Sequence, residues 1–344
     1  MLEGCSTNAV VAKIHAIRGK MFKAENYREL MTRRSVSEAA EYLSRSARFR
    51  DVFGEADPNT VHRGFLEELL YRENFNTYIR LCRFQQLEGQ PFYDFPVRRK
   101  EIQTILTVIN DINSPMDSLS LNALPGYIIA HSRVKLMEVS TAKTYEELLK
   151  ALKGTRYFKI LSKIPPREDG SADYTECELR LRTNYYSDML RRVREDLPGD
   201  SKHELEEMIL RDIDGRNIIN AYRMKAFFGF SAAEIKRRSL NFSCIGKKRM
   251  EKIYECESAE DMLEMIGGTV YGRGITGSGS IETAVYSEKY RYLCSKLAGA
   301  TSAPVALYAF VELCETDVSN IVHIIEGIRY GANPAVIESQ LIML

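Results

Sequence analysis

Apolar residues along most of the chain recur at intervals of three and four positions, the spacing that places them on one face of an α-helix. Clear examples lie in three separate segments, at Phe65, Leu66, Leu69 and Leu70, at Leu205, Met208 and Ile209, and at Ile321, Ile324, Ile325 and Ile328. Strict alternation of apolar and polar residues, the pattern of a half-buried strand, is scarce. Turn signals such as Pro125-Gly126, Pro198-Gly199 and Gly267-Gly268 divide the chain into helices of ordinary length. The pattern therefore predicts an all-α fold.

One arrangement of residues occurs three times, and we call it the box. Residues 36–49, 145–158 and 259–272 each start with acidic residues, continue with an apolar helical turn and end near an aromatic residue. The helix that follows each box carries a glutamate, at Glu67, Glu178 and Glu282. A further element then places a carboxylate three positions before Asn or Thr, at Glu101 with Thr104, at Asp214 with Asn217, and at Asp317 with Asn320.

The period of this repeat is much longer than the roughly 20 to 50 residues of a solenoid repeat, so each copy is large enough to fold as a domain. The length of 344 residues also favours two or three domains over one. We predict three similar helical bundles in tandem, at residues 1–122, 123–238 and 239–344. Equivalent apolar faces would be buried in each bundle, which implies pseudo-threefold symmetry.

The repeated carboxylates allow two interpretations; they are Glu67, Glu178, Glu282, Glu101, Asp214 and Asp317. Paired carboxyl groups can serve as general acids and bases. An active site is asymmetric, however, whereas these residues occur once per copy at matching places. We therefore favour an architectural role, in which each carboxylate holds arginine or backbone N–H groups between helices, and Asn217 and Asn320 satisfy buried polar groups.

Composition excludes some classes of protein and favours others. The 48 basic and 47 acidic residues give a net charge of +1, which lacks the basic excess of a general nucleic-acid binder. The seven cysteines are scattered without a C-x-x-C motif, so we expect free thiols in a reducing compartment. Glu3 stands where a signal peptide needs positive charge, and the longest uncharged stretches, 118–132 and 297–311, are too short to span a bilayer. We expect no secretion signal and no direct insertion into the bilayer.

Residues 267–280 are rich in glycine, and Gly272, Gly274 and Gly277 form a G-x-G-x-x-G pattern. Such a turn binds a pyrophosphate when it joins a strand to a helix, but a predicted helix precedes it here and no P-loop lysine follows. A mobile, ligand-free loop between helices is therefore favoured over a nucleotide site. The five histidines lie far apart without metal-ligand spacing. We predict no catalytic residue, no metal and no cofactor, and expect that the chain is not an enzyme.

Clusters of basic residues are the other candidate functional feature. They alternate with acidic runs, so solvated helix faces explain them simply. The sharper interpretation is that they face acidic surfaces of protein partners, where charge complementarity sets register and encounter rate. The candidate contact residues are Arg98, Arg99, Lys100, Lys236, Arg237, Arg238, Lys247, Lys248 and Arg249.

Two stretches suggest a family. One runs from Asp214 through Asn217 and Tyr222 to Phe228-Gly229-Phe230-Ser231, and the other is the box at 145–158. Their order and triplication resemble the C subunit of the archaeal and bacterial V-type (A-type) rotary ATPases, called the d subunit in eukaryotes, over essentially the whole chain. The first copy departs most, with Thr104 in place of asparagine and no glycine matching Gly154.

The resemblance implies a funnel of three helical domains and a non-catalytic role in the central stalk of an ion-translocating ATPase. The partners it implies are the central shaft and the membrane rotor ring, with one copy of the chain in a hetero-oligomeric complex. It also implies a cytoplasmic location, peripheral on the membrane through the ring. Two alternatives stay open: a helical enzyme that binds a phosphorylated ligand at residues 267–280, and a generic helical adaptor.

Overall fold

The computed structural model describes residues 2–53, 62–114, 126–197, 199–275 and 280–343. Every regular element in these ranges is helical, which confirms the predicted all-α fold class. The chain forms two compact units. The large unit comprises Met1–Leu87, Gly199–Gly229 and Ser243–Leu344, and the small unit comprises Glu88–Pro198 and Phe230–Phe242. The division into three bundles at 1–122, 123–238 and 239–344 stays a prediction.

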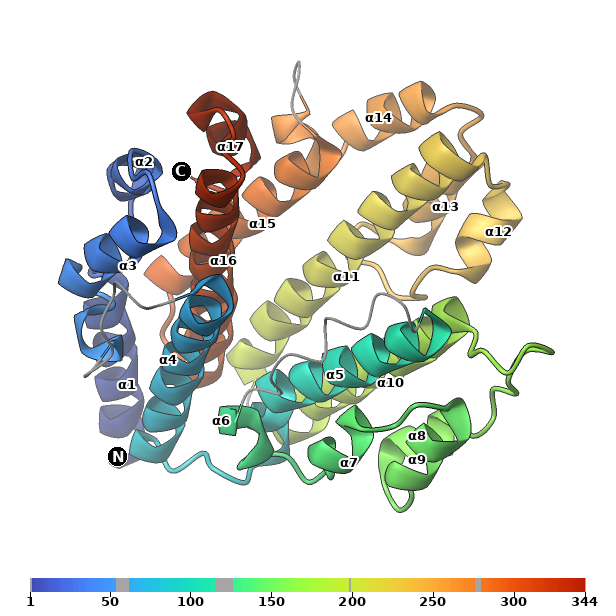
Figure 1. Ribbon diagram of the computed structural model, residues 1–344, viewed down its shortest axis with the longest axis horizontal. Helices are drawn as coiled ribbons and strands as arrows, with labels where there is room; N and C mark the ends of the chain where they lie inside the picture. Colours follow the sequence, from blue (N-terminus) through green and yellow to red (C-terminus); the bar gives the residue numbers. More distant parts are fainter. Residues whose placement is uncertain (1, 54–61, 115–125, 198, 276–279, 344) are drawn as a thin grey trace. The chain divides into compact units, whose positions relative to one another are not determined.

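The small unit is built around two long helices, α5 and α10, that pack against each other (Figure 1). Shorter helices cover them, with α7 against α5 and α9 against α10. Side-chain caps start several of these helices: Thr144, Thr155 and Asp173 each accept a hydrogen bond from a backbone N–H in the first turn. The elements are η3 (Pro91–Asp94), α5 (Phe95–Asn113), α6 (Gly126–Ile129), α7 (Leu136–Ser140), α8 (Tyr145–Ala151), α9 (Arg156–Leu161), α10 (Tyr174–Asp196) and α12 (Ala232–Arg237).

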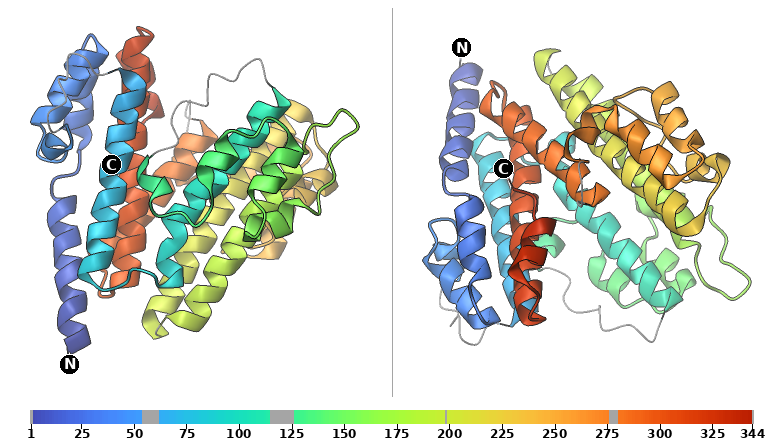
Figure 2. Two further views of the ribbon diagram at one scale, coloured as in Figure 1. Left: turned by 60° about the horizontal axis from the view of Figure 1, so that its bottom comes forward. Right: turned by 90° about the horizontal axis from the view of Figure 1, so that it is seen from above.

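The large unit is organised around the helix α16 (Ala303–Arg329), whose neighbours include α1, α2, α3, α4, α11, α15 and α17. The helix α4 lies beside it in both views of Figure 2. The other elements are α1 (Leu2–Arg18), α2 (Ala24–Met31), α3 (Val36–Arg45), η1 (Arg50–Val52), α4 (Arg63–Phe84), α11 (Gly199–Phe228), α13 (Lys247–Glu255), α14 (Ala259–Gly267), η5 (Val270–Gly274), α15 (Ile281–Ala298) and α17 (Pro334–Gln340).

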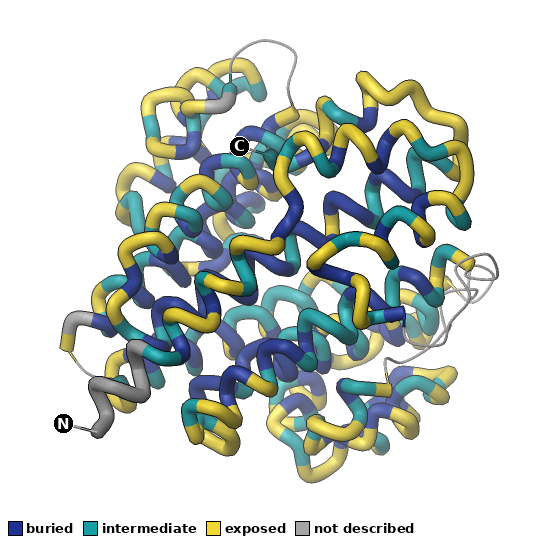
Figure 3. The backbone as a smooth tube through the Cα atoms, turned by 90° about the vertical axis from the view of Figure 1, so that its left-hand side faces the viewer, coloured by how far each residue is buried: buried dark blue, intermediate teal, exposed yellow. Residues whose placement is uncertain are grey.

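One apolar cluster of the large unit joins segments that are far apart in sequence. Side chains of α2, α3 and α4, such as Leu30, Leu43 and Leu70, pack with Ile321 and Ile325 of α16. Figure 3 shows the buried residues recurring along the helices, as expected for amphipathic helices that share a core. The segment that contains the first box is thus held against the last long helix.

The helix α17 approaches α16 closely at Gly327. A Cβ atom at this position would overlap Cδ1 of Ile337. Glycine is therefore needed on α16 so that the isoleucine side chain of α17 can be accommodated. The helix α11 ends in the exposed Phe228, and the exposed Tyr330 directly follows α16. Each aromatic residue is followed by a glycine with positive φ, Gly229 at 61° and Gly331 at 64°. Among the helices that the structure describes, none is long and apolar enough to span a membrane.

Candidate functional site

Three buried carboxylates lie on three different long helices. Glu101 is on α5, Asp214 on α11 and Asp317 on α16, and they are 6%, 0% and 2% exposed. Each accepts a hydrogen bond from a tyrosine hydroxyl. A buried carboxylate without such partners would be costly, so these contacts explain how the three groups are tolerated.

Glu101 is satisfied on both oxygens within the small unit. Tyr157 of α9 donates to Oε2 over 2.6 Å, and the Ser132 hydroxyl donates to Oε1 over 2.6 Å. Burial and the charge of Glu101 raise the pKa of Tyr157 well above its usual value, so the phenol stays protonated and acts as a donor. The contacts join α5 to α9 and to the segment before α7.

Asp214 fixes the chain that leads into α13. The backbone N–H groups of Cys244 and Ile245 donate to its Oδ2 over 2.9 and 3.1 Å, and the Tyr271 hydroxyl donates to the same atom over 3.3 Å. Burial raises the pKa of Asp214, while these hydrogen bonds lower it in part. The carboxylate thus holds two later segments, the approach to α13 and η5, against α11.

Asp317 accepts a hydrogen bond from Tyr27 of α2, and Arg48 lies near it. Arg48 Nη2 donates to Asn74 Oδ1 over 2.7 Å and contacts Cys314 Sγ at 3.7 Å. Burial raises the pKa of Asp317 to about 6, although the Tyr27 hydrogen bond and the charge of Arg48 lower it. The site joins α2, α4 and α16.

Asn320, one turn after Asp317, anchors the segment after α17. Its side-chain amide donates to the carbonyl of Ile342 over 2.7 Å and accepts from the N–H of Ile342 over 3.0 Å. Asn217, at the corresponding place on α11, is also buried. Both asparagines therefore lie inside the large unit.

The residues that reach these carboxylates follow the repeat. Tyr157 and Tyr271 occupy the last-but-one position of their boxes, where the first box has Arg48. In the second and third boxes, this tyrosine donates a hydrogen bond to the carboxylate of the long helix that precedes the box. In the first box, Arg48 instead lies near Asp317 of α16 and lowers its pKa. There Tyr27, which lies outside the box, supplies the hydroxyl that Arg48 lacks.

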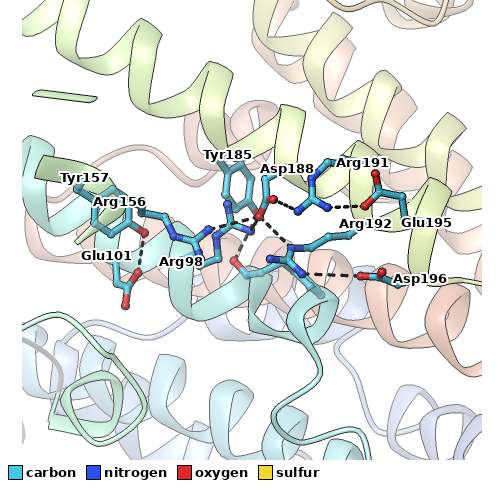
Figure 4. A network of polar contacts seen from close by, with 11 residues as sticks. Arg98, Glu101, Arg156, Tyr157, Tyr185, Asp188, Arg191, Arg192, Glu195 and Asp196 are labelled. Atoms are coloured by element: carbon cyan, nitrogen blue, oxygen red, sulfur yellow. Dashed lines mark hydrogen bonds and ion pairs between the residues drawn. The ribbon is translucent and has the colours of Figure 1, made fainter. Parts of the chain in front are cut away.

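A second network surrounds Asp188 in the small unit (Figure 4). Arg98 Nη1 lies 2.6 Å from Asp188 Oδ2, Arg192 Nε lies 2.9 Å from the same atom, and Arg191 Nη2 lies 2.6 Å from Oδ1. Arg156 adds a longer contact of 3.3 Å. Burial raises the pKa of Asp188, but the hydrogen bonds from Arg191 and Arg192 and the charge of Arg98 hold it below its usual value. The carboxylate stays ionised and ties α5 and α9 to α10.

None of these arrangements is an acid–base pair. Glu101, Asp214 and Asp317 sit on separate helices, and the partners described above are hydroxyls, backbone N–H groups and a guanidinium rather than a second carboxylate. The other repeated glutamates form ion pairs with arginine: Glu67 with Arg63 at 3.3 Å, Glu178 with Arg182 at 2.7 Å and Glu282 with Arg223 at 2.8 Å. The first two of these pairs lie within one helix, whereas Glu282 and Arg223 join α15 to α11.

The candidate contact residues differ in how accessible their side chains are. Arg98 is 6% exposed and belongs to the Asp188 network, so we remove it from the set, because a surface contact needs an accessible side chain. Near it, Arg99 lies over the Phe95 ring and Lys100 Nζ lies 3.2 Å from the Gln103 amide oxygen. Arg238 lies over the Phe230 ring at 4.4 Å. The side chains of the remaining candidates are exposed: Lys236, Arg237, Lys247, Lys248 and Arg249.

Lys247, Lys248 and Arg249 form the first turn of α13, which holds no acidic residue. Cations at a helix N-terminus oppose the helix dipole and cost about 0.3–1 kcal/mol each. Within the described ranges none of the three forms an ion pair. An acidic surface of a partner would offset this unfavourable interaction between the cations and the helix dipole. The first turn of α13 is therefore the candidate most suited to such a partner.

The glycine-rich segment differs in part from its prediction. Val270–Gly274 form η5, and Tyr271 is 1% exposed and bound to Asp214. The expectation of a mobile loop is thus wrong for its first half, because a buried aromatic side chain anchors it. Residues 276–279, with Gly277 of the G-x-G-x-x-G pattern, lie outside the described residues. The helix α14 precedes the segment, where a dinucleotide fold has a strand.

A hollow of about 1050 Å³ lies between α2, α3 and the segment after α1. Its lining is balanced in charge, with Lys20, Lys23, Arg33 and Arg45 against Glu25, Glu29, Glu38 and Glu41. A phosphorylated ligand would need an excess of positive charge, which this hollow lacks. Among the described residues, no three His, Cys, Asp or Glu side chains gather to hold a metal ion.

The repeated boxes and the partnered carboxylates define a class of all-α proteins in which successive helical segments are joined through buried polar sites. The sequence matches the ATP synthase (C/AC39) subunit family over residues 10–340, and the chain belongs to that family.

Several relatives are named as the C subunit of A-type ATP synthase. The one from Methanosarcina mazei is 22% identical over 97% of this chain and 92% of its own length. The one from Desulfurococcus is 25% identical over 77% of this chain and 68% of its own length. The one from Pyrococcus horikoshii is 32% identical over 42% of this chain and 39% of its own length. The resemblance noted in the sequence is confirmed.

Proposed function

We propose that this chain is the non-catalytic subunit that links the central shaft of a rotary ATPase to its membrane rotor ring. The family match over residues 10–340 carries the proposal, with relatives named as the C subunit of A-type ATP synthase. In this role the chain transmits rotation between ATP turnover in the head and ion movement in the membrane. It is peripheral on the cytoplasmic face and is held there by the ring.

The internal contacts suit such a role. A part that transmits torque has to resist deformation, and buried polar contacts between helices resist sliding because each has a fixed geometry. Glu101, Asp214 and Asp317 supply such contacts at three places, and Asp188 adds a four-arginine network. This supports a rigid connecting body.

For the contact with a partner we propose the first turn of α13, at Lys247, Lys248 and Arg249, facing an acidic surface of the shaft or ring. Its exposure, its lack of ion pairs among the described residues and its unfavourable position on the helix support this choice. The other exposed candidates, Lys236 and Arg237, are a second contact region in the small unit.

Reconstitution of the ATPase with and without this chain tests the coupling role. Without the chain, we expect ATP hydrolysis by the head to continue while ion pumping into vesicles falls, and we expect pumping to return when the purified chain is added. Binding of the chain to the isolated shaft and to the isolated ring is measured in parallel. Full pumping by a complex shown to lack the chain would refute the proposal.

A further inference from the structure

The three carboxylate–tyrosine contacts differ in how much chain they enclose. Tyr157 and Glu101 are 56 positions apart, and Tyr271 and Asp214 are 57 apart. Tyr27 and Asp317 are 290 positions apart. The first two contacts close local segments, whereas the third fastens residues 24–53 to a helix made much later in the chain.

Few polar contacts hold this early segment to α16. Among the described residues, the buried ones include the Tyr27–Asp317 hydrogen bond, a contact of Tyr27 with Asn320, and the contact between Arg48 and Cys314. Apolar packing of side chains such as Leu30 and Leu43 supplies the rest. Attachment of the segment therefore depends strongly on the state of the Asp317 site, since one buried charge can offset several apolar contacts.

The groups that face Asp317 leave its charge incompletely balanced. Tyr27 of α2 faces it as a neutral donor, Arg48 comes from the segment between α3 and η1, and Tyr290 of α15 and Cys314 of α16 are neutral groups that its charge affects. Arg48 directs its hydrogen bonds to Asn74 of α4 and to Cys314. As far as α1, α3, α11 and α17 are described, none contributes a group that shifts Asp317.

We propose that Asp317, Tyr27 and Arg48 form a proton-sensitive clasp that fastens residues 24–53 to α16 more tightly in mild acid than at neutral pH. Protonated Asp317 still accepts the Tyr27 hydrogen bond through its carbonyl oxygen and carries no buried charge. The proton comes from solvent and returns to it. The inference concerns the isolated chain and does not depend on the proposed function.

The direction of the pH dependence follows from the difference between the pKa of Asp317 in the folded chain and its pKa in the opened segment. Burial raises the pKa of Asp317 from 3.8 to about 6 in the folded chain, and solvent restores the lower value when the segment opens. The stabilisation is complete below the lower pKa and is lost as the pH rises through the higher one. The opening equilibrium of residues 24–53 should therefore rise about tenfold between pH 5 and pH 7.5.

Hydrogen exchange of the full chain, corrected for the intrinsic effect of pH, tests the clasp. We expect the protection of α2 and α3 to fall about tenfold from pH 5 to pH 7.5. Asp317→Asn keeps an acceptor for Tyr27 without a charge, so its protection should be high and independent of pH over this range. Glu101→Gln is the matched control, and α2 and α3 should keep the wild-type pH dependence in that variant.

Protection of α2 and α3 that stays constant or rises with pH in the wild-type chain would overturn the clasp, and so would an unchanged pH dependence in Asp317→Asn. If Asp317→Asn does not fold, Arg48→Met serves in its place. Loss of this cation raises the pKa of Asp317 further, so the pH midpoint of opening should move upward. An unmoved midpoint in Arg48→Met would also overturn the proposal.

Discussion

Arg48 holds the place in its box that Tyr157 holds in the next, but Tyr157 donates a hydrogen bond to the buried Glu101, whereas Arg48 lowers the pKa of the buried Asp317 through its charge. The two residues differ in chemistry, because one is a cation and the other a neutral donor. The two long helices also differ from each other, at the position three residues before the buried carboxylate. Arg98 lies three positions before Glu101, whereas Cys314 lies three positions before Asp317. Arg98 forms an ion pair with Asp188, whereas Cys314 contacts Arg48 of the first box.

Tyr157→Phe should destabilise the small unit by about 1–2 kcal/mol, because the buried Oε2 of Glu101 loses its donor. The free energy of unfolding in urea measures the effect. Tyr330→Phe is the matched control, since Tyr330 is 75% exposed. Equal stabilities of the two variants would contradict the structural importance of this hydrogen bond.

Arg98→Met should cost about 3 kcal/mol, because it removes one partner of a buried ion pair. Arg191→Met removes a contact to the same carboxylate from a side chain that is 49% exposed, so we expect a loss below about 1 kcal/mol. Denaturant titration compares the two. A similar loss in both variants would mean that burial does not distinguish these arginines.

The Asp188 network also sets a pH dependence opposite to that of Asp317. The pKa of Asp188 is lower in the folded chain than in the unfolded chain, so its contribution is present above the unfolded value and is lost as the pH falls below about 4. Hydrogen exchange of α10 should accelerate on acidification once corrected for intrinsic rates. Arg98→Met should weaken this dependence, and an unaltered one would argue against the ion pair.

Gly327→Ala should destabilise the contact between α16 and α17 by about 1–3 kcal/mol, because the new methyl group meets the Ile337 side chain. Thermal unfolding measures the loss. Ile337→Ala in the same chain makes room for the methyl group, so the two substitutions should cost less together than the sum of their separate costs. Strict additivity would show that the two residues do not compete for space.

Substitution of Lys247, Lys248 and Arg249 together by glutamate should weaken assembly with the shaft or ring and reduce its salt dependence. The isolated chain should remain folded and become slightly more stable, since acidic residues suit a helix N-terminus. Co-sedimentation and thermal unfolding measure the two effects. Glutamate at Lys153, Lys159 and Lys163 makes the same charge change elsewhere, and equal weakening by both variants would reject the proposed contact turn.

The periodic pattern was sufficient to predict helices and to single out Glu101, Asp214 and Asp317, because these residues recur in a fixed register. Tyr157 and Tyr271 could have been identified as their partners, since both occupy one position of the box. Tyr27 could not, because it lies outside the box and reaches Asp317 only through the packing of α2 on α16.

Two sequence-based predictions were wrong because they concerned side chains that become buried only in the folded chain. Arg98 is followed by two basic residues, a pattern that predicts a surface charge, but its side chain lies against Asp188 and Tyr185. The glycines after α14 suggested mobility, but Tyr271 among them is held by Asp214. Local composition does not indicate which side chain will contact a buried partner. The burial of Arg98 and of Tyr271 could therefore not be predicted from the sequence.

The pairing of the first box with α16 sets an order of events during synthesis. A ribosome completes α2, α3 and α4 long before it makes α16, whereas each of the other two boxes follows its partner helix after only two short helices. The apolar side chains of α2, α3 and α4 therefore lack their packing partners on α16 until synthesis is almost complete. A chain interrupted before Ala303 lacks α16 and would leave part of this apolar surface uncovered, and exposed apolar surface of this kind promotes aggregation.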